Sequence, residues 1–296
     1  STVLILIVIL VPLEKFNQRK LRFFNLSYRH QNIEKIDLSG KRGLIACTIC
    51  FLPVFFGFIL PFCVLANLGY GSLDIWINTD LTSAIKNTVV VSGLAAFITV
   101  LFGLLMVYGI RLSGRSLPQV IFPLTTIGYA APGAVLGIGI LVPLGIIDNW
   151  VADRVLDLTG YDPGLVFTGT AFAIILAYCV RFFSIAQHTV DGAFGRISPS
   201  LPNAAQSLGR NKLQVLLQIY RPLISTSTAT ALLLIFVDCV KELPATMLLR
   251  PFNFETLATR VHVQASLEDL PNAAPGSILI VLISLCAVFL LARTNE

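Results

Sequence analysis

Few residues of this 296-residue chain have the types and spacings that catalysis, metal binding or redox chemistry requires. Cys47 and Cys50 show the C-x-x-C spacing of metal and redox sites, but no second cysteine or histidine pair accompanies them. We interpret them as small apolar packing residues. The three histidines are scattered, Tyr129 and Tyr161 fall on different segments, and neither a P-loop nor a Ser/His/Asp or paired-carboxylate arrangement occurs. The sequence therefore predicts no enzyme, no cofactor and no metal site.

Lys241 and Glu242 are candidate functional residues, because these ionisable side chains lie inside or at the end of an apolar stretch. Ionisable groups in membrane segments are costly and usually face a cavity or a partner. Neighbouring residues of a helix point in different directions, so these two should not pair fully with each other. One hypothesis places them at an outer gate, bonded to another half of the protein; a structural salt link or interfacial snorkelling is an equal alternative.

The composition indicates that a membrane surrounds these residues. The chain is 55% hydrophobic and 12% charged, with a mean hydropathy of +0.82, whereas soluble domains carry about 25% charged residues. A membrane helix needs roughly 20 apolar residues. Stretches that meet or approach this length are residues 1–13 (truncated), 43–68, 88–110, 117–146, 165–186, 222–248 and 274–292. We predict an all-α, polytopic transmembrane bundle of six full spans, the third bent or broken near residues 128–133.

The positions of the lysines and arginines predict the orientation. If the basic linker 14–42 is cytoplasmic, sixteen of them, Arg181 included, lie inside and four outside. Both ends are then inside, and the net charge of +5 indicates no nucleic-acid partner. We interpret the linker as a solvated connector beside anionic lipid. The acidic residues outside, Asp148 among them, we expect to keep loops hydrated rather than serve a partner.

The loop 187–221 between two spans has the pattern of two short helices. Ser198 can cap the first helix and Asn211 the second, and Gly209 allows the left-handed turn between them. The first helix has one apolar face, made of Leu201, Ala204, Ala205 and Leu208. The second repeats the spacing with Leu213, Leu216, Leu217 and Tyr220 before Pro222 opens the next span. Such a hairpin could transmit motion from a cytoplasmic partner, or it could merely cover the inner face of the bundle.

The same loop resembles the EAA loop of ABC importer permeases. That pattern is Glu-Ala-Ala, three residues, Gly, nine residues, Ile, one residue and Leu-Pro. Here the matching positions are Asn203, Ala204, Ala205, Gly209, Ile219, Arg221 and Pro222. Asn203 replaces the usual Glu and Arg221 the usual Leu. The resemblance implies that the first helix docks on a pair of cytoplasmic ATP-binding subunits, which hydrolyse ATP while the permease hydrolyses nothing.

Residues 237–254, together with the sequence RISPSLPNAAQSLG, resemble the second half of double-length ferric-iron importer permeases. The resemblance implies a bacterial-type inner membrane. It also implies that residues 1–13 end a preceding helix, that 14–42 link the halves, that 43–296 form the six-span domain, and that a first half is missing before Ser1. An external substrate-binding protein would dock on residues 148–163 and 250–271. Sulfate, thiamine, phosphonate and polyamine remain alternative substrates, and an ion-coupled secondary transporter is the main rival class.

Overall fold

The computed structural model describes residues 40–71, 73–76, 79–113, 125–198 and 200–294. Within these ranges the regular structure is helical, without strands. Six helices are long and apolar enough to cross a membrane: Gly40–Tyr70, Thr79–Arg111, Gly133–Thr159, Phe172–Gly195, Lys212–Val240 and Leu270–Arg293. The predicted all-α fold with six full spans is therefore confirmed. Residues 1–13, predicted to end a preceding helix, and most of the predicted linker 14–42 lie outside the described residues.

The chain divides into two compact units, with the boundary between Val64 and Leu65. The first contains α2 (Gly40–Val54), a π-helical turn (Phe55–Ile59) and the start of α3 (Leu60–Tyr70). Pro53 removes one backbone donor from the helix just before the π-turn, which is a usual place for such an irregularity. No residue of α2 or the π-turn is buried, as suits apolar side chains that face lipid.

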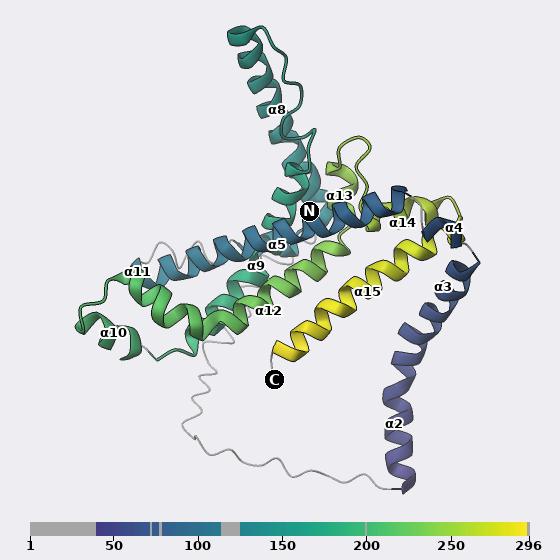
Figure 1. Ribbon diagram of the computed structural model, residues 1–296, viewed down its shortest axis with the longest axis horizontal. Coiled ribbons are helices and arrows are strands. Elements are labelled where there is room, and N and C mark those ends of the chain that lie inside the picture. The colour runs from purple at the N-terminus through teal and green to yellow at the C-terminus, as the bar shows by residue number, and fades with distance from the viewer. Residues whose placement is uncertain (1–39, 72, 77–78, 114–124, 199, 295–296) are drawn as a thin grey trace. The chain divides into compact units, whose positions relative to one another are not determined.

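The second unit is built on α5 (Thr79–Ser113), α9 (Phe172–Gly195) and α12 (Arg221–Val240), which lie side by side, with α15 (Leu270–Thr294) against α12 (Figure 1). Small residues make the close approach of these helices feasible. Ala95, Ala177 and Ala231 are fully buried in one core cluster, and the Sγ of Cys179 lies 3.8 Å from the Ala95 carbonyl oxygen. Dispersion contacts between closely packed backbones therefore hold these spans together.

Two of the spans are interrupted. The short helix α7 (Ile127–Ala130) is followed by extended residues Ala131 and Pro132 and then by α8 (Gly133–Thr159). This confirms the break predicted near residues 128–133. The span predicted over 222–248 instead ends at Val240, and a separate helix α13 (Pro244–Leu249) follows. Pro244 lacks a backbone N–H donor and restricts the residue before it, which explains why a new helix begins there.

Asp148 corrects one expectation. It lies inside α8, it is fully buried, and it accepts hydrogen bonds of 2.5–3.0 Å from the backbone N–H groups of Val166, Phe167 and Thr168 and from the Thr168 hydroxyl. The expectation that it hydrates an outer loop is therefore wrong. Its carboxylate instead ties α8 to the turn before α9, because a buried charge is stable only when donors surround it.

Arg181 corrects another. The charge count assigns it to the inside, but it lies in the middle of α9, within the predicted span 165–186. The loop that follows is correspondingly shorter than 187–221, because helix resumes at Ser200 and again at Lys212. One of the sixteen charges assigned to the inside therefore lies within a helix that can span the membrane, and the orientation stays a prediction.

Candidate functional site

The predicted helical hairpin is present as α10 (Ser200–Ser207) and α11 (Lys212–Val215), which we call the α10–α11 segment. At its corner Gly209 has φ +85°. The Gly209 N–H donates to the Gln206 carbonyl (2.9 Å) and the Arg210 N–H to the Ala205 carbonyl (3.1 Å). These two bonds form a Schellman motif, which requires a left-handed residue and so favours glycine. The turn is thus specified by local sequence.

Asn211 caps α11, as predicted. Its side chain accepts from the Gln214 N–H (2.8 Å), and the Gln214 side chain accepts from the Asn211 N–H (3.0 Å), which completes a capping box. A π-helical turn (Leu216–Tyr220) leads into α12, which begins at Arg221. The helix therefore runs without a gap from the corner into a membrane span.

The apolar face predicted for the second helix is partly wrong. Val215 is the buried residue (2% exposed), whereas Leu213 and Leu217 are exposed. The π-turn adds residues to one turn of the helix and so shifts which side chains face the core. Tyr220 is half-buried and packs on Phe194 of α9, with ring centroids 4.8 Å apart. The Tyr108 hydroxyl of α5 donates to the Lys212 carbonyl at 2.6 Å.

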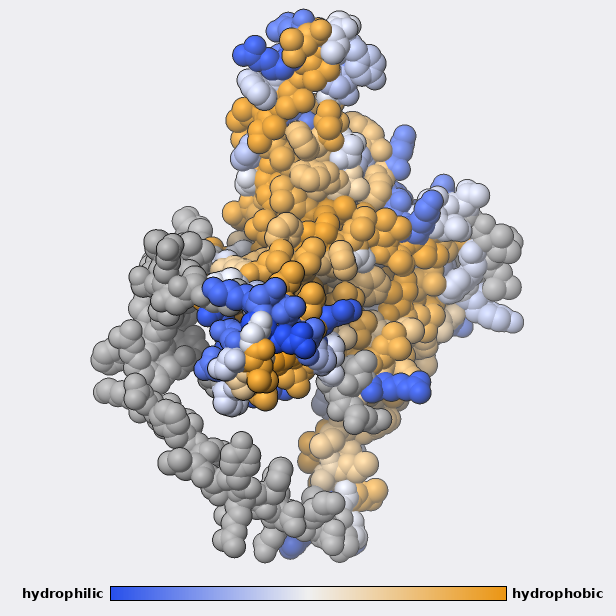
Figure 2. Space-filling model, turned by 60° about the vertical axis from the view of Figure 1, so that its left-hand side comes forward, coloured by the Kyte–Doolittle hydropathy of each residue, from blue (hydrophilic) through white to orange (hydrophobic). Residues whose placement is uncertain are grey.

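In α10, by contrast, most of the predicted apolar face is exposed. Leu201 and Leu208 are exposed, Leu208 by 84%. Asn203 and Ala204 are exposed and Ala205 is half-buried, so Pro202 is the one buried residue of this helix. Of the remaining predicted residues, Ile219 is half-buried and Pro222 exposed. Figure 2 shows hydrophilic residues gathered around this end of the second unit, next to the apolar flanks of the spans.

Lys241 and Glu242 lie in the gap between α12 and α13 and take different partners. The Lys241 Nζ lies 2.8 Å from the Asp238 Oδ1 and the side chain is 60% exposed. The Glu242 Oε2 lies 3.3 Å from the Arg181 Nε, its Oε1 accepts from the Ala245 N–H at 3.2 Å, and its side chain is 7% exposed. The prediction that the two neighbours would not pair with each other is confirmed. Their role at a gate stays a prediction.

These charges line an open cavity of about 520 Å³, which we call the charged cavity; its lining is Tyr129, Arg181, Phe182, Asp238, Lys241 and Glu242. Gly133 packs against the ion pair: a Cβ there would lie 2.5 Å from the Arg181 Nη1 and 2.8 Å from the Glu242 Oε1. Both helix breaks therefore meet at this pair. Sequence reasoning missed the role of Arg181, although an arginine within an apolar stretch is itself a signal.

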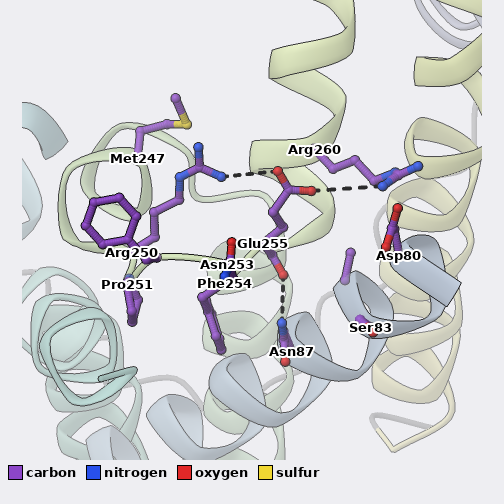
Figure 3. Close-up of a pocket in the computed structure, with 12 residues that line it drawn as sticks. Asp80, Ser83, Asn87, Met247, Arg250, Pro251, Asn253, Phe254, Glu255 and Arg260 are labelled. Atoms are coloured by element: carbon purple, nitrogen blue, oxygen red, sulfur yellow. Dashed lines mark hydrogen bonds and ion pairs between the residues drawn. The ribbon is translucent and has the colours of Figure 1, made fainter. Parts of the chain in front are cut away.

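A second cavity, of about 750 Å³, lies between the first turns of α5 and the segment from Met247 to Arg260, which includes the start of α14 (Leu257–Ser266) and part of the surface 250–271 (Figure 3). Glu255 sits between two arginines, with Arg250 at 3.4 Å and Arg260 at 3.9 Å. The Asn87 side chain of α5 donates to the Glu255 carbonyl at 3.0 Å. This network anchors the loop before α14 to a membrane span. Docking of a binding protein on regions 148–163 and 250–271 stays a prediction.

Comparison with known proteins bears on all of these features. The chain is 30% identical over 215 residues to the Fe(3+)-transport system permease protein FbpB 2 of Haemophilus influenzae, covering 73% of this chain and 39% of the relative. It is 24% identical to the sulfate transport system permease protein CysT of Salmonella typhimurium, covering 84% and 88%. The chain spans less than half the length of the ferric transport permeases it matches, between 36% and 42%.

The fold is similar to a chain of a bacterial alginate ABC transporter crystallised with its alginate pentasaccharide-bound periplasmic protein. The TM-score is 0.60 with 17% sequence identity, over 86% of this chain and 94% of the other. The family model for binding-protein-dependent transport system inner membrane components matches residues 99–294. That range contains the α10–α11 segment and the charged cavity. The chain therefore belongs to the family of binding-protein-dependent transport system inner membrane components.

Proposed function

We propose that the chain is a permease subunit of an ATP-driven importer, in which α10 docks on a cytoplasmic ATP-binding subunit and moves α12. The observation that carries this proposal is the exposed apolar face of α10, joined by the Gly209 corner to a helix that continues into the membrane. Exposed leucines on a short, well-formed helix are typical of a surface that binds another protein. Both ends of the chain are then on the cytoplasmic side of the inner membrane.

Stiffness of the connection is what lets such a segment act as a lever. The capping box fixes the start of α11, and Tyr220, Phe194 and Tyr108 hold the next turn on α9 and α5. A displacement of α10 is then passed to three spans together. Asn203 offers no carboxylate, so docking would rest on the small and apolar side chains. ATP is hydrolysed in the partner subunits, and this chain converts their closure into movement.

We propose ferric iron as the substrate, delivered by an external binding protein that docks on surfaces 148–163 and 250–271. Similarity to ferric transport permeases supports iron, and similarity to a sulfate permease keeps sulfate as the second candidate. A further permease half with its own coupling loop would complete the pathway.

The test is ATP-driven uptake of radiolabelled ferric iron into liposomes that hold the complete permease, its ATP-binding subunits and its binding protein. Gly209→Val should lower uptake at least tenfold while the complex stays assembled, because a β-branched residue at φ +85° is strained. Gly209→Asn should keep most of the uptake, since asparagine tolerates this conformation.

Gly40→Val is the matched control. Gly40 also has positive φ (+65°) and open space around it, so the backbone strain is similar, but it lies far in sequence from the lever and from the proposed docking surfaces. Equal losses in the Gly40 and Gly209 variants would contradict the coupling role. Uptake of sulfate but not iron by the unaltered complex would leave the class standing and replace the substrate.

A further inference from the structure

We propose that the charged cavity binds an oxyanion during translocation, either a free oxyanion or one that accompanies ferric iron as its chelator. This inference rests on the proposed function and names the chemical class of its cargo. It is argued from the depth of the cavity, from the hydrogen-bonding state of its side chains and from the two helix breaks that meet there.

Depth comes first. Arg181 lies about 14 Å along the axis of α9 from its first residue, Phe172, at 1.5 Å per residue. The hydrocarbon core of a bilayer is about 30 Å thick, so the guanidinium is near the middle of a span. Ionisable groups at that depth are expensive and usually line a pathway. The two interrupted helices leave the room that a pathway needs, because irregular backbone within a membrane is tolerated where it lines a cavity.

The hydrogen bonds of the cavity side chains then indicate whether the ligand is an anion or a cation. Both carboxylates are occupied by donors of the protein: Glu242 by the Ala245 N–H and the Arg181 Nε, and Asp238 by the Lys241 Nζ. The spare capacity is on the cations. The Nη1 of Arg181 is buried with no acceptor among the described residues, and the ammonium of Lys241, which has three donors, is more than half exposed beside the cavity.

A bare ferric ion prefers hard oxygen ligands, but here both carboxylates already pair with a cation of the protein, so the ion would have to compete with Arg181 and Lys241 for them. An oxyanion fits instead, because a guanidinium presents paired N–H donors that match two oxygens of one anion. Tyr129 also lines the cavity, and its hydroxyl is a neutral donor. Gly133 keeps the backbone of α8 close against this group, where any larger residue would displace the arginine.

The competing explanation is that Arg181 only neutralises the buried Glu242. A paired substitution separates the two. Arg181→Gln alone leaves a buried carboxylate without its cation and can fail by misfolding, whereas Arg181→Gln with Glu242→Gln removes both charges and restores the balance. If Arg181 only neutralises Glu242, the double variant should regain wild-type behaviour. If it binds the oxyanion, the double variant should fold and stay defective.

The experiment measures the midpoint of thermal unfolding of the complete, detergent-purified permease in sodium sulfate, in ferric citrate, and in sodium chloride of equal ionic strength. We expect sulfate, ferric citrate or both to raise the midpoint above that in chloride for the unaltered protein. The shift should vanish in the double variant and remain in Arg293→Gln, which alters an exposed arginine at the end of α15. Uptake by the double variant should fall at least tenfold.

The measurements in sulfate and in ferric citrate distinguish a free oxyanion from an anion that chelates iron. Stabilisation by sulfate identifies a free oxyanion, and stabilisation by ferric citrate without sulfate identifies a chelate. A double variant that keeps both the stabilisation and the uptake would overturn the proposal, as would an unaltered protein that neither anion stabilises. Gly209→Val should lose uptake yet keep the anion-dependent shift, so failure of the coupling mechanism and failure of the anion site give different results.

Discussion

The helix end at Ser207 and the helix end at Val240 are held by different interactions. After Ser207, the chain turns on bonds between residues that are neighbours in sequence, from Gly209 to Gln206 and from Arg210 to Ala205. After Val240, the chain is held by Glu242, whose partner Arg181 belongs to another span. The first end is a locally encoded corner that leaves its helix exposed. The second is a tertiary junction beside a cavity.

This difference indicates how each region responds when neighbouring helices move. A corner built from local bonds keeps its shape when neighbouring helices move, which suits a lever. A junction that depends on one buried ion pair between spans is sensitive to any displacement of either span, which suits a pathway that opens and closes. Four substitutions test the contrast, and each is measured as a change in the free energy of unfolding of the purified permease.

Glu242→Ala should have the largest effect, about 4 kcal/mol, because breaking a buried pair leaves an uncompensated charge. The carboxylate is 7% exposed and has two donors. Denaturant titration in detergent would measure the loss. Asp153→Ala, at an exposed position of α8, is the control. Equal and small losses in both variants would show that the junction does not depend on the pair.

Asp148→Ala should cost about 3 kcal/mol, since three backbone N–H groups and one hydroxyl lose a charged acceptor. Asp148→Asn should recover part of the loss, because the amide oxygen still accepts. The same titration compares the two. An alanine variant as stable as the asparagine variant would show that the hydrogen bonds of Asp148 do not stabilise the contact between α8 and the turn before α9.

Asn211→Ala should cost about 1 kcal/mol, the usual value of a helix N-cap. It tests the locally encoded region, where a lost bond exposes donors to water rather than to a buried interior. Unfolding of the variant is compared with that of Ser207→Ala, which lies in α10 outside the capping box. A loss as large as that of Glu242→Ala would mean that the corner is a tertiary structure after all.

Lys241→Ala should have the smallest effect on stability, at most about 0.5 kcal/mol, because the lysine side chain is 60% exposed and its pair with Asp238 is an i,i+3 link at a helix end. The same variant assayed for uptake tests the predicted gate. Stability near wild type with uptake lost would support a functional role, and wild-type uptake would remove Lys241 from the site.

Much of the fold was predictable because membrane spans obey strong local rules. Apolar stretches located six spans, although α9 extends to Gly195 and the fifth begins at Lys212. Helix ends in membranes are less predictable than helix existence, since polar residues can remain helical where neighbouring spans bury them. The break near Pro132 was predicted from the sequence, whereas the end of a span at Val240 was not, although Pro244 is a local signal for it.

The sequence by itself determined the corner of the α10–α11 segment, since Gly209 and Asn211 act through bonds to residues within five positions of them. It also determined the apolar face of α10. Only the tertiary structure decided which face of α11 is buried, because a π-turn shifts the register. It also decided the partners of Asp148, Arg181 and Glu242. The physical reason is that a buried charge takes whichever donor or acceptor the packing of other helices brings within reach, and spacing along the chain does not encode that.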